Sequence, residues 1–157
     1  MARILLSTFA CLLLSSISVA GAADTLSIKL LSGEELQLQM VRDKPIYLKF
    51  WATWCGKCRA QMPHLEAIHR TYGDELNVVA VNLGFNDTPE LVRQFQKEYD
   101  LTVPIALDEL GNIARAFDVT VVPYSIIIDR DGIIVHRKFG DEGVDEIIAG
   151  LLEQHRQ

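Results

Sequence analysis

Cysteine is scarce in this sequence, and its scarcity limits the chemistry that the chain can perform. Three cysteines occur in 157 residues, namely Cys11, Cys55 and Cys58. A tetrahedral zinc site needs two ligands beyond one Cys-x-x-Cys pair, usually a second pair, which the sequence lacks. The histidines show no paired ligand spacing; they are His64, His69, His136 and His155. We therefore expect neither a structural metal ion nor another bound cofactor.

Basic runs, internal repeats and low-complexity segments are also absent. The formal net charge is −6, and acidic and basic residues are mixed along the chain. A nucleic-acid-binding surface needs a concentration of basic residues, so we expect no nucleic-acid partner. The chain after its N-terminal segment has the length of one domain, which we expect to be a monomer.

Residues 1–22 have the composition of a secretory signal. Arg3 gives a short basic start, residues 4–19 are largely apolar, and the small residues 20–22 form a cleavage pattern. A membrane-spanning helix needs about 20 apolar residues, so an uncleaved anchor is the rival interpretation. Cleavage would leave residues 23–157 as a soluble domain in the periplasm or elsewhere outside the cytoplasm, without Cys11.

The pair Cys55 and Cys58 lies between a predicted strand and a predicted helix. Residues 46–51 are a nearly continuous apolar run, typical of a strand buried on both faces, and a helical pattern covers residues 55–72. At a helix N-terminus, free backbone N–H groups and the helix dipole stabilise a thiolate, the reactive form of cysteine. Two intervening residues allow the second sulfur to reach the first, so the motif predicts dithiol–disulfide exchange.

Residues 50–63 read Phe-Trp-Ala-Thr-Trp-Cys-Gly-Lys-Cys-Arg-Ala-Gln-Met-Pro and resemble the thioredoxin superfamily. They are most similar to the TlpA/ResA/DsbE-like group of bacterial extracytoplasmic thiol–disulfide oxidoreductases. The resemblance implies a thioredoxin fold with Cys55 as the nucleophile, Cys58 as the resolving cysteine and Pro63 as a helix-kinking proline. It also implies that Val122 precedes a cis-proline, Pro123, which faces the disulfide and contacts partner proteins.

The remaining pattern predicts the other elements of such a fold. Two short strands, at residues 26–31 and 35–40, form an N-terminal β-hairpin. Further strands are expected at residues 76–83, 103–107, 125–128 and 132–139, and further helices from residues 87–90 through Tyr99, at 113–117 and at 144–152. The expected fold class is α/β: a three-layer α/β/α thioredoxin fold with an N-terminal hairpin and a βα-type insert after residues 76–83.

The residues around the motif depart from that group in their charge. Lys49 lies six residues before Cys55, where thioredoxins carry a buried acid. It either lies near the sulfurs and favours the thiolate, or extends to the surface. Lys57 replaces a common proline and adds a second cation inside the motif. We expect Lys49, Lys57 and the adjoining Trp54 to tune the pKa of Cys55.

Three further positions bear on the direction of electron flow and on partner contact. Arg59 adds a cation after the motif, and Gln61 stands where many members of the group have a glutamate, so a candidate general acid–base is missing. A cationic site should lower the pKa of Cys55, and a more stable thiolate makes the disulfide a stronger oxidant. Val122 lacks a hydroxyl, so its side chain can offer a partner only apolar contact.

The leading interpretation is an exported thiol–disulfide oxidoreductase that reduces disulfides of partner proteins. Cytochrome c maturation and copper-centre assembly are typical settings of the group, with electrons supplied by a membrane or periplasmic donor. The cationic site favours a thiol oxidant instead. A copper metallochaperone that uses Cys55, Cys58 and a histidine such as His136 is a further alternative. A peroxidase is less favoured, because the Pro-x-x-x-Thr pattern before the lone cysteine of such enzymes is absent.

The N-terminal pattern leads to a first test. We expect signal cleavage to produce a mature protein that starts near Ala23, and intact-mass analysis of the extracytoplasmic fraction checks this. A species that retains residues 1–22 and sediments with membranes would support an anchor instead.

Overall fold

The computed structural model describes residues 27–37 and 43–154. The expected signal at residues 1–22, with Cys11, lies outside this range, as do His155 and the ends of the predicted N-terminal strands. Strands in the described part are β1 (Ser27–Lys29), β2 (Glu35–Gln37), β3 (Ile46–Trp51), β4 (Asn77–Asn82), β5 (Ile105–Leu107), β6 (Tyr124–Ile128) and β7 (Ile134–Phe139). Helices there are α1 (Gly56–Tyr72), α2 (Pro89–Glu98), α3 (Asn112–Ala116) and α4 (Val144–Glu153).

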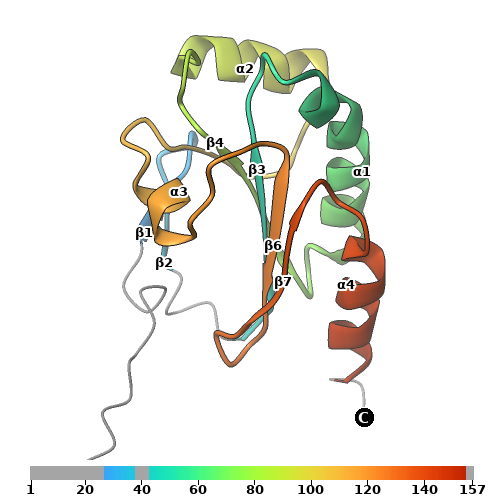
Figure 1. The fold of residues 1–157 in the computed structure, drawn as a ribbon. Coiled ribbons are helices and arrows are strands. Elements are labelled where there is room, and N and C mark those ends of the chain that lie inside the picture. The colour runs from blue at the N-terminus through green and yellow to red at the C-terminus, as the bar shows by residue number, and fades with distance from the viewer. Residues whose placement is uncertain (1–26, 38–42, 155–157) are drawn as a thin grey trace, which may run out of the picture.

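A five-stranded mixed sheet in the order β5-β4-β3-β6-β7 forms the middle layer (Figure 1). Strand β3 lies parallel to β4 and antiparallel to β6, and it is buried at all six positions. Burial on both faces explains why its sequence is nearly continuously apolar rather than alternating. The antiparallel pair β1 and β2 forms the predicted N-terminal hairpin within the described residues.

Each face of the sheet is covered by helices, and one hydrophobic cluster fills the space between the sheet and the helices on each face. One cluster joins Tyr47 and Trp51 of β3 to buried residues of α1, α2 and α4. The other joins Leu48 and Phe50 to α3 and to β1. Figure 1 shows α1 and α4 on one side of the sheet and α3 with the hairpin on the other. The predicted three-layer thioredoxin-like fold is therefore confirmed.

Side chains alternate along a strand, and this alternation decides where Lys49 points. Lys49 has the same parity as Tyr47 and Trp51, so it faces the layer that contains α1 and α4. The position in β3 thus directs a lysine inward, toward the helix that begins after Cys55.

Helix α1 presents a buried stripe at helical spacing, with Cys58, Met62, Leu65 and Ile68 against the sheet. Pro63 lies inside the helix, where its missing N–H interrupts the hydrogen-bond ladder.

Helix α2 begins one residue later than the sequence pattern indicates. Thr88 is its N-cap, accepting from the N–H of Leu91 at 3.3 Å, with Pro89 in the first turn. The carboxylate of Asp87 does not cap the helix but accepts hydrogen bonds from Thr53 and Asn82. No helix within the described residues combines the length and apolar character that crossing a membrane requires.

Candidate redox site

Cys55 and Cys58 form a disulfide at the N-terminus of α1. Cys55 is the N-cap residue, and its Sγ accepts a hydrogen bond from the backbone N–H of Cys58 at 3.1 Å. That N–H would stabilise a Cys55 thiolate in the reduced protein, as N-cap groups stabilise other acceptors. Cys55 is 9% exposed whereas Cys58 is fully buried, so Cys55 is the one of the two that a partner can reach.

The Val122–Pro123 peptide bond is cis, as the resemblance implied. Phe50 near the end of β3 pairs with Tyr124 at the start of β6. This register places Val122 and Pro123 at the same end of the sheet as the turn that leads to Cys55. The carbonyl of Pro123 accepts from the N–H of Gly140 at 2.9 Å, which ties this peptide to the segment after β7.

Lys49 is buried, with 1% of its surface exposed, so the surface alternative for this residue is wrong. Its Nζ donates to Oε1 of Gln61 at 2.8 Å, to the carbonyl of Gly140 at 3.0 Å and to Oγ of Ser125 at 3.2 Å. Burial lowers the pKa of Lys49 to about 8, with Asp141 opposing the shift and Lys57 adding to it. Its influence on the sulfurs stays a prediction.

The other two cations near the cysteines, Lys57 and Arg59, contact different parts of the structure. The exposed Lys57 places its Nζ 4.6 Å from the centre of the Phe139 ring, a cation–π contact with β7. Arg59 donates from Nε to the hydroxyl of Tyr99 at 3.1 Å, at the end of α2. The site therefore keeps Lys49 and Lys57 within electrostatic reach of each other, while Arg59 is drawn toward α2.

A carboxylate that sequence reasoning did not select holds the turn before the disulfide. Asp87 is buried and accepts from the N–H of Thr53 at 2.9 Å, from the Thr53 hydroxyl and from Nδ2 of Asn82 at 2.7 Å. The Asn82 side chain in turn accepts from the N–H of Gly84 at 2.8 Å. The sequence contained a signal for this contact, because Asn82 and Asp87 lie at and after the end of the buried strand β4. The carboxyl ends of the parallel strands β3 and β4 lie side by side, so polar residues there can reach the turn after β3.

Two exposed aromatic rings contact each other next to the motif: Trp54, which precedes Cys55 in the chain, and Phe85. Trp54 is 53% exposed and Phe85 is 66% exposed, and their rings meet edge to face with centres 6.3 Å apart. The indole Nε1 of Trp54 donates to the carbonyl of Phe85 at 2.7 Å. The loop between β4 and α2 therefore holds Trp54 as well as Thr53.

The described residues contain no group of three or more histidine, cysteine, aspartate or glutamate side chains that could hold a metal ion. His136, the suggested copper ligand, pairs with Ile127 in the sheet and does not join Cys55 and Cys58 in such a group. His64 instead lies between the carboxylates of Asp141 and Asp145.

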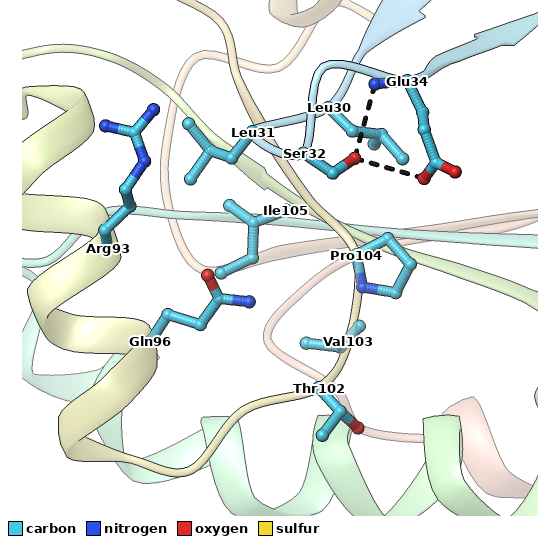
Figure 2. A pocket seen from close by; sticks show the side chains of 10 residues that line it. All are labelled: Leu30, Leu31, Ser32, Glu34, Arg93, Gln96, Thr102, Val103, Pro104 and Ile105. Carbon is cyan, nitrogen blue, oxygen red and sulfur yellow. Dashed lines mark hydrogen bonds between the residues drawn. The ribbon is translucent and has the colours of Figure 1, made fainter.

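A pocket of about 300 Å³ lies away from the predicted site residues (Figure 2). It is lined by the turn between β1 and β2, by α2 and by the segment that leads into β5. Leu31 and Ile105 face this space, and Arg93 and Gln96 reach toward it from α2. None of the predicted redox residues lines this pocket.

The chain is similar to known proteins in both sequence and fold. The sequence profile of the Redoxin family matches residues 20–151. The chain belongs to the Redoxin family. It is 43% identical over 113 residues to the thioredoxin-like protein YneN of Bacillus subtilis, covering 71% of this chain and 66% of YneN. It is 32% identical over 117 residues to the thiol-disulfide oxidoreductase ResA of Bacillus thuringiensis, covering 74% of this chain and 67% of ResA.

The chain thus spans about two thirds of the length of these curated relatives. Its fold is also similar to that of the exposed lipoprotein thioredoxin Etrx1 of Streptococcus pneumoniae, with a TM-score of 0.70 and 27% identity. That match covers 82% of this chain and 98% of Etrx1. The resemblance to ResA-like thiol–disulfide oxidoreductases of the thioredoxin superfamily is therefore confirmed.

The position of Lys57 between the two cysteines in the chain leads to a prediction. In the reduced protein, Lys57→Gln should raise the pKa of Cys55, because a nearby positive charge no longer stabilises the thiolate. Thiolate absorbance against pH measures the change. Lys29→Gln, on the exposed hairpin across the sheet, is the matched control and should leave the titration unchanged. Equal titrations of the parent and Lys57→Gln would mean that solvent screens this lysine.

A second prediction concerns Asp87. Asp87→Ala leaves the Thr53 N–H and the Asn82 amide without their acceptor and should lower the free energy of unfolding by about 1–3 kcal/mol. It should also increase the rate at which Cys55 is alkylated in the reduced protein, since the turn before it loses its anchor. Urea unfolding and iodoacetamide labelling check both effects. Asp74→Ala, at an exposed aspartate after α1, should change neither; equal effects from the two variants would contradict the proposed anchoring.

Proposed function

We propose that this protein is an exported thiol–disulfide oxidoreductase that reduces disulfides of partner proteins outside the cytoplasm. The observation that carries the proposal is the unequal exposure of the two cysteines at the start of α1: Cys55 keeps 9% of its surface exposed, whereas Cys58 is fully buried. The similarity to ResA supports the reaction class, and the pattern of residues 1–22 supports export of residues 23–157.

The reaction follows from these positions. In the reduced protein, the Cys55 thiolate attacks one sulfur of the partner's disulfide, forms a mixed disulfide and releases the other partner sulfur as a thiolate. Cys58 then loses its proton and attacks Sγ of Cys55. That step releases the second partner sulfur and leaves the Cys55–Cys58 disulfide. Two electrons have passed to the partner, and a membrane or periplasmic dithiol donor must return them.

Partner contact is proposed for the surface around Cys55. Val122 is half-buried, and its apolar side chain packs against both hydrophobic clusters of the domain. The exposed ring of Trp54 adjoins Cys55 in the chain. A partner segment beside its own cysteine would therefore meet apolar groups at Trp54 and Val122 as well as the exposed cation of Lys57. Cytochrome c maturation and copper-centre assembly are the proposed settings.

Thiol oxidation in the opposite direction is the second candidate. The buried charge of Lys49 and the nearby Lys57 favour the thiolate, which makes a disulfide more oxidising. Equilibration with glutathione buffers decides between the two. A reduction potential near that of thioredoxin, about −270 mV, supports the reductant, and one near −120 mV supports the oxidant.

The order of attack leads to a further prediction. Cys58→Ser should accumulate complexes joined to partners through Cys55, because the second step is blocked. Cys55→Ser should trap few or none, since Cys58 is buried. Non-reducing gels of extracytoplasmic extracts, followed by mass spectrometry, check this. A Cys55→Ser variant that traps more partner than Cys58→Ser would reverse the assigned roles.

A further inference from the structure

All three N–H donors of the Lys49 ammonium have an acceptor. A charged lysine has three such donors and no acceptor, and Nζ contacts Gln61, Gly140 and Ser125. The bonding therefore suits the charged form of the side chain. Among the described residues, no carboxylate forms a salt bridge with Lys49, which is unusual for a cation that is 1% exposed.

Gln61 connects this cation to a carboxylate that it does not touch. Its Oε1 accepts from Lys49 at 2.8 Å, and its Nε2 donates to Oδ1 of Asp141 at 2.6 Å. Because one end of the amide faces a donor and the other an acceptor, its orientation is determined by its partners. Asp141 also contacts Nδ1 of His64 at 3.2 Å, and Nε2 of His64 lies 3.0 Å from Asp145. A hydrogen-bonded chain thus leads from the buried ammonium to the surface of α4.

The same ammonium joins the two parts of the redox site. Gln61 lies one turn after Cys58 in α1, on the helix that carries the disulfide. Gly140, whose carbonyl accepts from Lys49, donates its N–H to the carbonyl of Pro123 at 2.9 Å. Ser125, the third contact, follows Pro123 by two residues and donates to the carbonyl of Gly140 at 2.5 Å. Lys49 therefore lies between the cysteine helix and the cis-proline segment.

Keeping a charge at this position has a cost. Burial disfavours the charged amine, and the other charged groups that act on it are Asp141, which favours its charge, and Lys57, which opposes it. His136 on β7 also lies within the electrostatic influence of Lys49. An apolar side chain could fill the same space without the cost of burying a charge. A role in the chemistry of the site explains the charge better than a role in folding.

We propose that Lys49 is a buried positioning cation of the redox site and that Gln61, by linking it to Asp141, keeps it charged. In this position the charge favours the dithiol state of Cys55 and Cys58, because that state contains the thiolate. The proposal rests on thiol–disulfide exchange at this pair and on neither the partner nor the direction of electron flow.

The test is the equilibrium of five proteins with glutathione at one neutral pH: the parent, Lys49→Met, Gln61→Leu, the double variant and the control Lys29→Met. Lys49→Met should shift the equilibrium toward the protein disulfide by about tenfold, which corresponds to about 30 mV. Gln61→Leu should shift it in the same direction by roughly threefold, since Lys49 then holds its proton less strongly. In the double variant, Gln61→Leu should add nothing to Lys49→Met, because Gln61 acts through the lysine.

Additive shifts in the double variant would show that Gln61 does not act through Lys49 and would overturn the proposal. So would a Lys49→Met equilibrium within twofold of the parent, or an equal shift in the control Lys29→Met. Urea unfolding of the oxidised proteins verifies that each variant is folded. If Lys49→Met does not fold, Gln61→Leu decides alone, and an unchanged equilibrium in that variant overturns the proposal. A parent protein that fails to exchange with glutathione would instead refute the proposed function.

Discussion

The burial of strand β3 on both faces is the constraint on which the site depends. All six of its residues are buried. The neighbouring strands β4 and β6 determine which residues lie next to its carboxyl end, where the chain turns toward Cys55. Pairing with β6 places Pro123 at the same end of the sheet as the turn before Cys55, and pairing with β4 brings Asp87, which Asn82 contacts, to that turn. Because β3 cannot shift by one residue without turning Lys49 and Trp51 to the opposite face, the site and the core share one register.

The site combines an accessible sulfur with an electrostatic environment that is built from buried groups. Cys55 takes its N-cap position from the strand–turn–helix connection, and the N–H of Cys58 is directed at its sulfur. Lys49 adds a buried positive charge between α1 and the cis-proline segment, and among the described residues Gln61 is the hydrogen-bonded link between this charge and Asp141. Surface cations such as Lys57 act through solvent and are weaker for that reason. The partial exposure of Cys55 and the burial of the Lys49 charge are therefore separate consequences of the same layer packing.

Much of the fold could be predicted from local pattern. The apolar run of β3, the alternation in the hairpin and the helical spacing of α1 each follow from a period that is visible in the sequence. The sequence pattern predicts the start of α2 one residue too early, because Asp87 and Thr88 are both favourable N-cap residues in isolation. Asp87 instead bonds Thr53, which is 34 residues away in the chain, and only the pairing of β3 with β4 brings these two residues together.

The residues near the cysteines show where local information ends. The sequence by itself determined the reacting pair, because two cysteines separated by two residues after a buried strand have few other uses in a chain with one further cysteine. Whether Lys49 lay inside or outside was decided by tertiary structure alone. A lysine has a flexible stem that can reach water from many positions, and here three acceptors from α1, β6 and the segment after β7 converge on its amino group. Gln61 stands where the sequence comparison leads us to expect an acid. In the tertiary structure its amide lies between the buried Lys49 and the carboxylate of Asp141. Contacts between residues 12 to 91 positions apart make this arrangement, and no local period encodes them.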